Sequence, residues 1–237
     1  MPICRTFLLA LVALLLGACQ SNPQADDPVQ PGEFSLRDVA KGDIDMVAEV
    51  SVRQTRDYLQ ALARKLYLRN PNQLARSENP QLDAAQAAAA LFDPQGAALT
   101  QLQGKRAAEA VALAFDEDFA GDRVAAFISG LNSMTLDAYG GEGDFYLHHE
   151  YDPQKLYHLA RNFEIAAWRL RNARDAQGQL FLLSSLDGNG VANLSFERLT
   201  GKLIALQDHF AYVVADTTNR RIKNVIQGVA SAVFFPI

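Results

Sequence analysis

Apolar residues along most of the chain recur at intervals of three and four, the spacing that places them on one face of an α-helix. The longest such segment runs from about residue 43 to residue 69, where the apolar positions oppose a face rich in arginine, aspartate and glutamine. The same spacing recurs over residues 82–92, 108–119, 124–138, 156–173, 196–213 and 222–233. We therefore predict an all-α, bundle-like single domain of about six to seven helices.

Residues that favour helix ends lie between these segments. Asp122 is predicted to cap the helix that follows it, and another helix is predicted to be capped near Ser195, because Asp and Ser side chains accept hydrogen bonds from the first backbone N–H groups of a helix. Four prolines each follow an asparagine or aspartate, a pair that suits a helix start or a helix end. They are Pro71, Pro80, Pro94 and Pro153. The segments 145–151 and 180–186 are candidates for short strands.

The N-terminus has the pattern of an export signal. Residues 7–16 are uninterrupted apolar residues, too few to cross a hydrocarbon core of about 30 Å as a helix. Leu16-Gly17-Ala18-Cys19 follows at once and resembles the lipobox of bacterial lipoproteins. The resemblance implies that a signal peptide, residues 1–18, is cleaved and that Cys19 carries fatty acids such as palmitate. It also implies sorting to the outer membrane rather than the inner one, because Gln20 follows the cysteine instead of an acidic residue.

The residues after Cys19 indicate a tether. Three prolines and a glycine lie among few apolar residues between positions 20 and 34, a composition that disfavours a packed core. We predict that residues 19–34 form a flexible tether and residues 35–237 the helical domain. As a flexible coil, the tether would reach about 20 Å.

Composition and charge narrow the function classes. The chain carries 22 Lys and Arg residues against 27 Asp and Glu residues, a net charge of −5, which argues against a nucleic-acid partner. Its two cysteines are Cys4, inside the predicted signal, and Cys19, so we expect no disulfide within one mature chain.

Candidate ligand-binding residues lie between positions 139 and 168, a segment rich in aromatic residues and histidines. The candidates are Tyr146, His148, His149, Glu150, His158 and Trp168. Histidines near carboxylates can bind a metal or carry protons. The chain has no HExxH motif, however, and neighbouring histidines diverge on a helix or strand, so we predict no metal and no cofactor. The acidic residues between 116 and 122 are interpreted as helix caps, and we assign no catalytic residue.

Three segments resemble a group of uncharacterised proteobacterial lipoproteins. They are DIDMV at 43–47, AFDEDFAGD at 114–122 and NLSFERL at 193–199. The resemblance implies no particular activity. We therefore expect a non-catalytic lipoprotein of the cell envelope, anchored to the membrane and facing the periplasm, that acts through contacts with an envelope protein. Two alternatives stay open: a small-ligand-binding protein or enzyme using residues 139–168, and an envelope inhibitor or immunity lipoprotein.

The C-terminal segment has two interpretations. An apolar stripe recurs at helical spacing and ends in two phenylalanines, with arginine and lysine beside it. The stripe consists of Ile222, Val225, Ile226, Val229 and Val233. It either closes the hydrophobic core or lies on the membrane surface, and we favour the core because amphipathic helices of globular domains usually serve it.

Overall fold

The computed structural model describes residues 43–93, 99–141, 151–185 and 192–217, all of which belong to the unit formed by residues 40–237. The prediction of an all-α fold is confirmed, since these residues form seven α-helices, one short 3-10 helix and no strand. The helices are α2 (Asp43–Arg69), α3 (Pro71–Leu74), α4 (Ala84–Ala90), α5 (Ala107–Leu113), α6 (Arg123–Ala138), α7 (Pro153–Asn172) and α8 (Leu194–Thr217), and the 3-10 helix is η2 (Thr100–Leu102).

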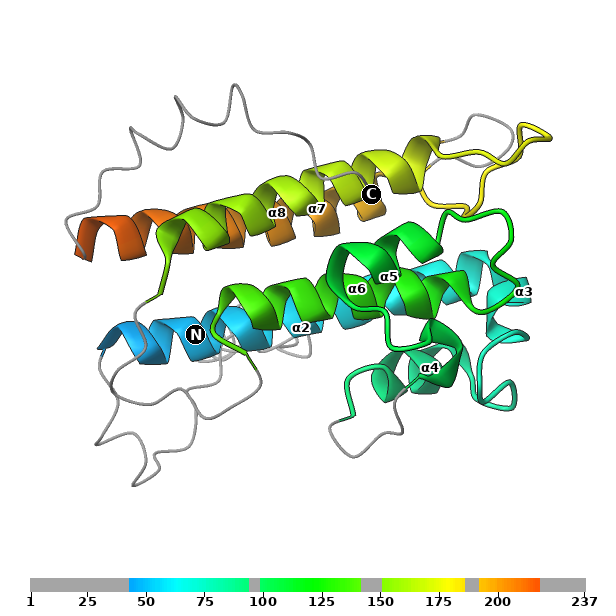
Figure 1. Ribbon diagram of the computed structural model, residues 1–237, viewed down its shortest axis with the longest axis horizontal. Coiled ribbons are helices and arrows are strands. Elements are labelled where there is room, and N and C mark those ends of the chain that lie inside the picture. The colour runs from blue at the N-terminus through cyan, green and yellow to red at the C-terminus, as the bar shows by residue number, and fades with distance from the viewer. Residues whose placement is uncertain (1–42, 94–98, 142–150, 186–191, 218–237) are drawn as a thin grey trace, which may run out of the picture. The chain divides into compact units, whose positions relative to one another are not determined.

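The four long helices form the bundle. α2 packs against α8 and α6, and α7 packs against the other sides of α8 and α6, so that the four surround one core (Figure 1). The short helix α5 lies on α6, and α4 lies on α2. None of the helices in the described ranges is long and apolar enough to cross a membrane.

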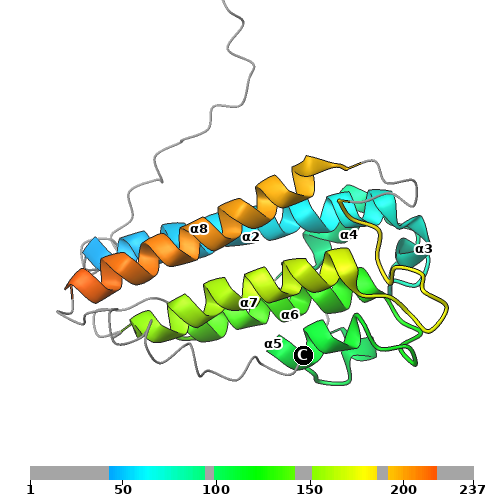
Figure 2. The same ribbon diagram turned by 90° about the horizontal axis from the view of Figure 1, so that it is seen from above.

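The pairing of α2 with α8 is antiparallel. Lys65 Nζ lies 3.0 Å from Ser195 Oγ near the start of α8, and Gln207 Nε2 donates to Thr55 Oγ1 at 2.7 Å further along. The beginning of α2 is therefore level with the end of α8, as Figure 2 shows. α3 and the turn after α7 lie at the opposite end of the bundle.

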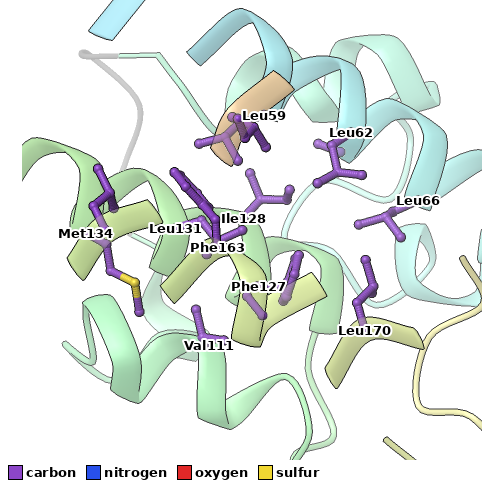
Figure 3. Packing of buried hydrophobic residues seen from close by; sticks show 14 of the residues in the cluster. Leu59, Leu62, Leu66, Val111, Phe127, Ile128, Leu131, Met134, Phe163 and Leu170 are labelled. Carbon is purple, nitrogen blue, oxygen red and sulfur yellow. The ribbon is translucent and has the colours of Figure 1, made fainter. Parts of the chain in front are cut away.

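The core is built from the predicted apolar faces. Leu59, Leu62 and Leu66 of α2 meet Phe127 and other side chains of α6, together with residues of α7 (Figure 3). All are buried, and burying one such side chain stabilises the fold by roughly 1.5–3 kcal/mol. The spacing of three and four residues along α2 explains why these side chains share one face.

One predicted helix is shorter than its pattern suggested. The segment 108–119 is helical only to Leu113. The carbonyl groups of Ala114 and Asp116 accept hydrogen bonds from the Arg123 side chain, at 3.0 Å and 2.7 Å, and that of Asp116 also accepts from the Phe119 N–H at 3.3 Å, a turn of three residues instead of a continued α-helix. The Asp116 side chain also accepts from the N–H of Asp118, which closes a turn instead of extending the helix.

The described part of the candidate strand 180–186 is not a strand. Leu180 makes only an isolated bridge with Arg174, and the backbone of Leu183 pairs with a side chain instead of a second strand. The Asn70 amide accepts from the Leu183 N–H at 2.8 Å and donates to its carbonyl at 2.9 Å. Nearly all of the other candidate strand, 145–151, and the predicted helix 222–233 lie outside the described residues.

The starts of α6, α7 and α8 follow the Asx pattern, whereas α3 and α5 have no side-chain cap. The Asp122 carboxylate caps α6, and Asp152 caps α7 ahead of Pro153, as the sequence indicated. For α8, the cap that was predicted near Ser195 is Asn193. The side chain of Asn193, two residues earlier, accepts from the Ser195 N–H at 3.1 Å, so the helix begins at Leu194.

Candidate functional site: a polar cleft beside the start of α6

The site residues predicted from the sequence are not brought together where the structure describes them. His158 and Trp168 lie ten residues apart on α7, roughly 15 Å along its axis. His158 is exposed and the Trp168 side chain is 60% exposed. Tyr146, His148, His149, Glu150 and Cys19 lie outside the described residues. In the described ranges, no group of three His, Cys, Asp or Glu side chains could hold a metal ion.

Two aromatic residues of the region 139–168 serve the core instead. Tyr139 stacks on Phe210 of α8 with ring centroids 5.2 Å apart, and its hydroxyl donates to Gln207 Oε1 at 2.7 Å. Gln207 in turn donates to Thr55. The Tyr151 hydroxyl donates to Asp45 Oδ1 at 3.0 Å. Burial raises the pKa of both tyrosines, so these hydroxyls remain protonated links between helices.

A polar cleft of about 480 Å³ lies at the end of the bundle that carries α3. Three segments far apart in the sequence line it: the α3 region, the loop before α6 with the first residue of α6, and the turn after α7. The lining residues are Asn72, Gln73, Arg76, Glu117, Asp118, Arg123, Asp175, Gln177, Leu180 and Phe181.

Arg123 is the most enclosed charge of the cleft. It is only 7% exposed, yet it forms no ion pair with any described residue. Its guanidinium lies over the rings of Phe181 and Phe119, with distances of 4.8 Å and 5.9 Å to the ring centroids. Burial lowers the pKa of Arg123, and the nearby positive charge of Arg76 lowers it further. Aromatic faces and carbonyl groups thus contact the guanidinium where a paired carboxylate is usual, and the negative charges of Asp116 and Asp175, beyond ion-pair distance, partly offset the lowering of its pKa.

The start of α6 is held by a dense set of hydrogen bonds. The Asp122 carboxylate accepts from the N–H groups of Val124 and Ala125 and from the Tyr67 hydroxyl, the last at 2.7 Å. The backbone N–H of Asp122 donates to the Gln101 side chain, and that of Arg123 donates to Gln73. Every backbone donor from 122 to 125 has an acceptor, so the position of Arg123 is rigidly defined.

Asp122 itself is fully buried and faces the interior rather than the cleft. Burial raises the pKa of its carboxyl to about 6, although the hydrogen bonds from Tyr67, Ala125 and Val124 act to lower it. The pKa of Tyr67 is raised by its burial and by the neighbouring carboxylate. Asp122 thus caps α6, in agreement with the prediction that the acids near 122 serve as caps, and its hydrogen bond with Tyr67 links α6 to α2.

The cleft was missed at the sequence level. Arg123 stands directly after a capping aspartate and close to Phe115 and Phe119, a pattern that shows only that a cation lies near aromatic rings. The contribution of Phe181 and Arg76 depends on tertiary contacts between separate segments. Comparisons with protein-family models, with curated proteins and with solved structures gave no match to this chain.

Proposed function

We propose that the protein is a lipoprotein of the bacterial cell envelope that acts by binding rather than by catalysis. The observation that carries the proposal is Leu16-Gly17-Ala18-Cys19 directly after ten apolar residues. Fatty acids on Cys19 would hold the chain at the membrane, facing the periplasm, with the outer membrane favoured by Gln20. Each buried methylene contributes about 0.8 kcal/mol, so two or three acyl chains anchor a protein stably.

The position of the cleft supports a binding role. α2 has 27 residues and is therefore about 40 Å long. The predicted tether precedes its first residue, Asp43, whereas the cleft lies beyond its last residue, Arg69. The cleft thus lies at the opposite end of α2 from the residue at which the chain enters this helix.

A second candidate function is small-ligand binding, which the cleft itself favours. Its volume of about 480 Å³ lies within the range of sites for small molecules. Among the described residues, those that support it are the ones around Arg123. The inhibitor or immunity alternative has no observation in its favour among the described residues.

Metabolic labelling tests the anchor. Replacement of the lipidated thiol in Cys19→Ala should abolish incorporation of a labelled fatty acid and leave an unprocessed precursor, because no other side chain of the lipobox can form the thioether. Cys4→Ala is the matched control and should be labelled and processed like the native chain. Normal labelling of Cys19→Ala would refute the lipoprotein proposal.

A further inference from the structure

We propose that the cleft beside α6 binds a small ligand that carries both a carboxylate and an ammonium group, as amino acids and short peptides do. Arg123 holds the carboxylate in this proposal, and Glu117 and Asp118 face the ammonium. The inference specifies the ligand of the small-ligand-binding function proposed above and does not depend on lipidation of Cys19.

Arg123 has side-chain donors that bind no described residue. Both of its side-chain hydrogen bonds, to the carbonyl groups of Ala114 and Asp116, are made by Nη1. Nε and Nη2 donate to no described residue, and neither atom is among the polar atoms sealed inside the protein without a partner. These two nitrogens lie on the same edge of the guanidinium, and that edge matches the two oxygens of a carboxylate.

Arg123 is a desolvated cation with no ion-pair partner among the described residues, which is energetically unfavourable. Asp116 and Asp175 attract it only from beyond ion-pair distance, and the aromatic faces of Phe181 and Phe119 compensate only part of the lost hydration. Arg76 lines the same cleft and brings a second positive charge close to the first. A carboxylate that entered would therefore gain more from this position than from an exposed arginine.

The acidic side chains of the cleft favour a ligand of mixed charge over a purely anionic one. Glu117, Asp118 and Asp175 line the cleft as well, so its three acidic side chains outnumber its two arginines. Oδ1 of Asp175 accepts from the N–H groups of Gln177 and Gln179 within its own turn, and the negative charge of this side chain already acts on Arg123. Glu117 and Asp118 are exposed, and their carboxylates bind no described residue. These two are the acceptors available to an ammonium group.

The cleft is formed before any ligand binds. The backbone that carries Arg123 is fixed by Asp122, Gln73 and Gln101, and Phe181 covers the guanidinium. A ligand would not have to order the donors that bind it, which removes a large part of the usual cost of association. The volume of about 480 Å³ lies within the range of sites for small molecules.

A pool of random tripeptides tests the proposal on the purified full chain, with bound peptides detected by native mass spectrometry and titrated by calorimetry. The same pool is offered with free termini, with acetylated N-termini and with amidated C-termini. We expect the free form to bind, and each blocked form to bind at least about tenfold more weakly because one charge-assisted contact is lost.

Variants locate the binding site. Arg76→Gln and Glu117→Gln, both at exposed positions of the cleft, should each weaken binding of the free pool severalfold, and Arg123→Lys should weaken it at least about tenfold because lysine lacks the forked edge. The matched controls Arg53→Gln and Glu109→Gln remove exposed charges outside the cleft and should bind like the native chain. Binding that is absent up to about 10 mM peptide would overturn the proposal. Equal binding by blocked and free pools, or by cleft and control variants, would overturn it too. Since the readout is peptide binding, the result is separate from fatty-acid labelling of Cys19.

Discussion

At the scale of single residues, the carboxyl group of Asp122 makes the free energy of unfolding depend on pH. Its carboxyl has a pKa of about 6 in the folded chain against 3.8 as the ordinary value, so between these values the folded state holds more protons than the unfolded state. The stabilising contribution is complete below about pH 4 and is lost as pH rises through 6. Burying the charged form above pH 6 costs on the order of 3 kcal/mol relative to pH 4.

Asp122→Asn tests this directly. The amide oxygen can still accept from the N–H groups at the start of α6, but the residue no longer titrates. Urea unfolding of both proteins at pH 4 and pH 7 should show the variant gaining stability relative to the native chain as pH rises, by up to about 3 kcal/mol. Asp137→Asn, at an exposed position on the same helix, should show no such gain. A stability difference that is the same at both pH values would contradict the buried, titrating carboxyl.

At the scale of helices, the contact of α5 with α6 depends on a missing side chain. A Cβ atom at Gly130 would lie 2.6 Å from Val111 Cγ2, 2.7 Å from the backbone nitrogen of Val111 and 2.8 Å from the Ala107 carbonyl oxygen. Two of these atoms belong to the backbone, so only a shift of the whole helix α5 would make room. Nearby, Ser133 Oγ accepts from the Ala107 N–H at 2.7 Å and would lose that bond in such a shift.

Gly130→Ala should therefore destabilise the fold by about 1–3 kcal/mol through overpacking. Gly201→Ala is the matched control, since a Cβ atom there meets nothing within 4 Å. Because Gly201 lies within α8, alanine should stabilise that helix by up to about 1 kcal/mol. Thermal unfolding of the two variants should move in opposite directions, and a rise in the melting temperature of Gly130→Ala would contradict the close packing.

The helices were predictable because their sequence patterns are local, whereas some helix ends depend on residues far away in the sequence. The bounds of α2 follow from its apolar spacing alone, and Asp122 caps α6 because Asp favours that position anywhere. The end of α5 was not predictable, since it depends on Arg123 reaching back to Ala114 and Asp116. The segment near Leu183 likewise depends on Asn70, a residue more than a hundred positions earlier.

At the scale of the molecule, the same limit applies to the site. The cleft joins the α3 region, the loop before α6 and the turn after α7, and no local pattern places these segments together. The aromatic and histidine residues between 139 and 168 gave a stronger sequence signal, but Tyr139 and Tyr151 prove to be core residues. Composition identifies chemically capable residues, whereas the fold decides which of them share a cavity.

The end of the bundle opposite the cleft leaves apolar surface open among the described residues. Met46, Val47 and Val50 of α2 are 41%, 42% and 46% exposed. They lie level with the last turns of α8, since Thr55 pairs with Gln207 and the two helices run antiparallel. α8 ends at Thr217, at this same end of the bundle (Figure 2).

The apolar stripe between Ile222 and Val233 lies outside the described residues, and its pattern predicts that it completes the core. Five aliphatic side chains at about 1.5–3 kcal/mol each would rival the net stability of a domain, about 5–15 kcal/mol, before the entropy of ordering is subtracted. Deleting residues 220–237 from the Cys19→Ala chain should therefore unfold or aggregate it, as measured by thermal unfolding and light scattering.

Val225→Asp with Val229→Asp should act in the same direction because both positions lie on the stripe, and Asn224→Asp, which lies off it, should not. If the shortened chain keeps its melting temperature and loses only its binding to anionic liposomes, the stripe serves the membrane surface instead of the core.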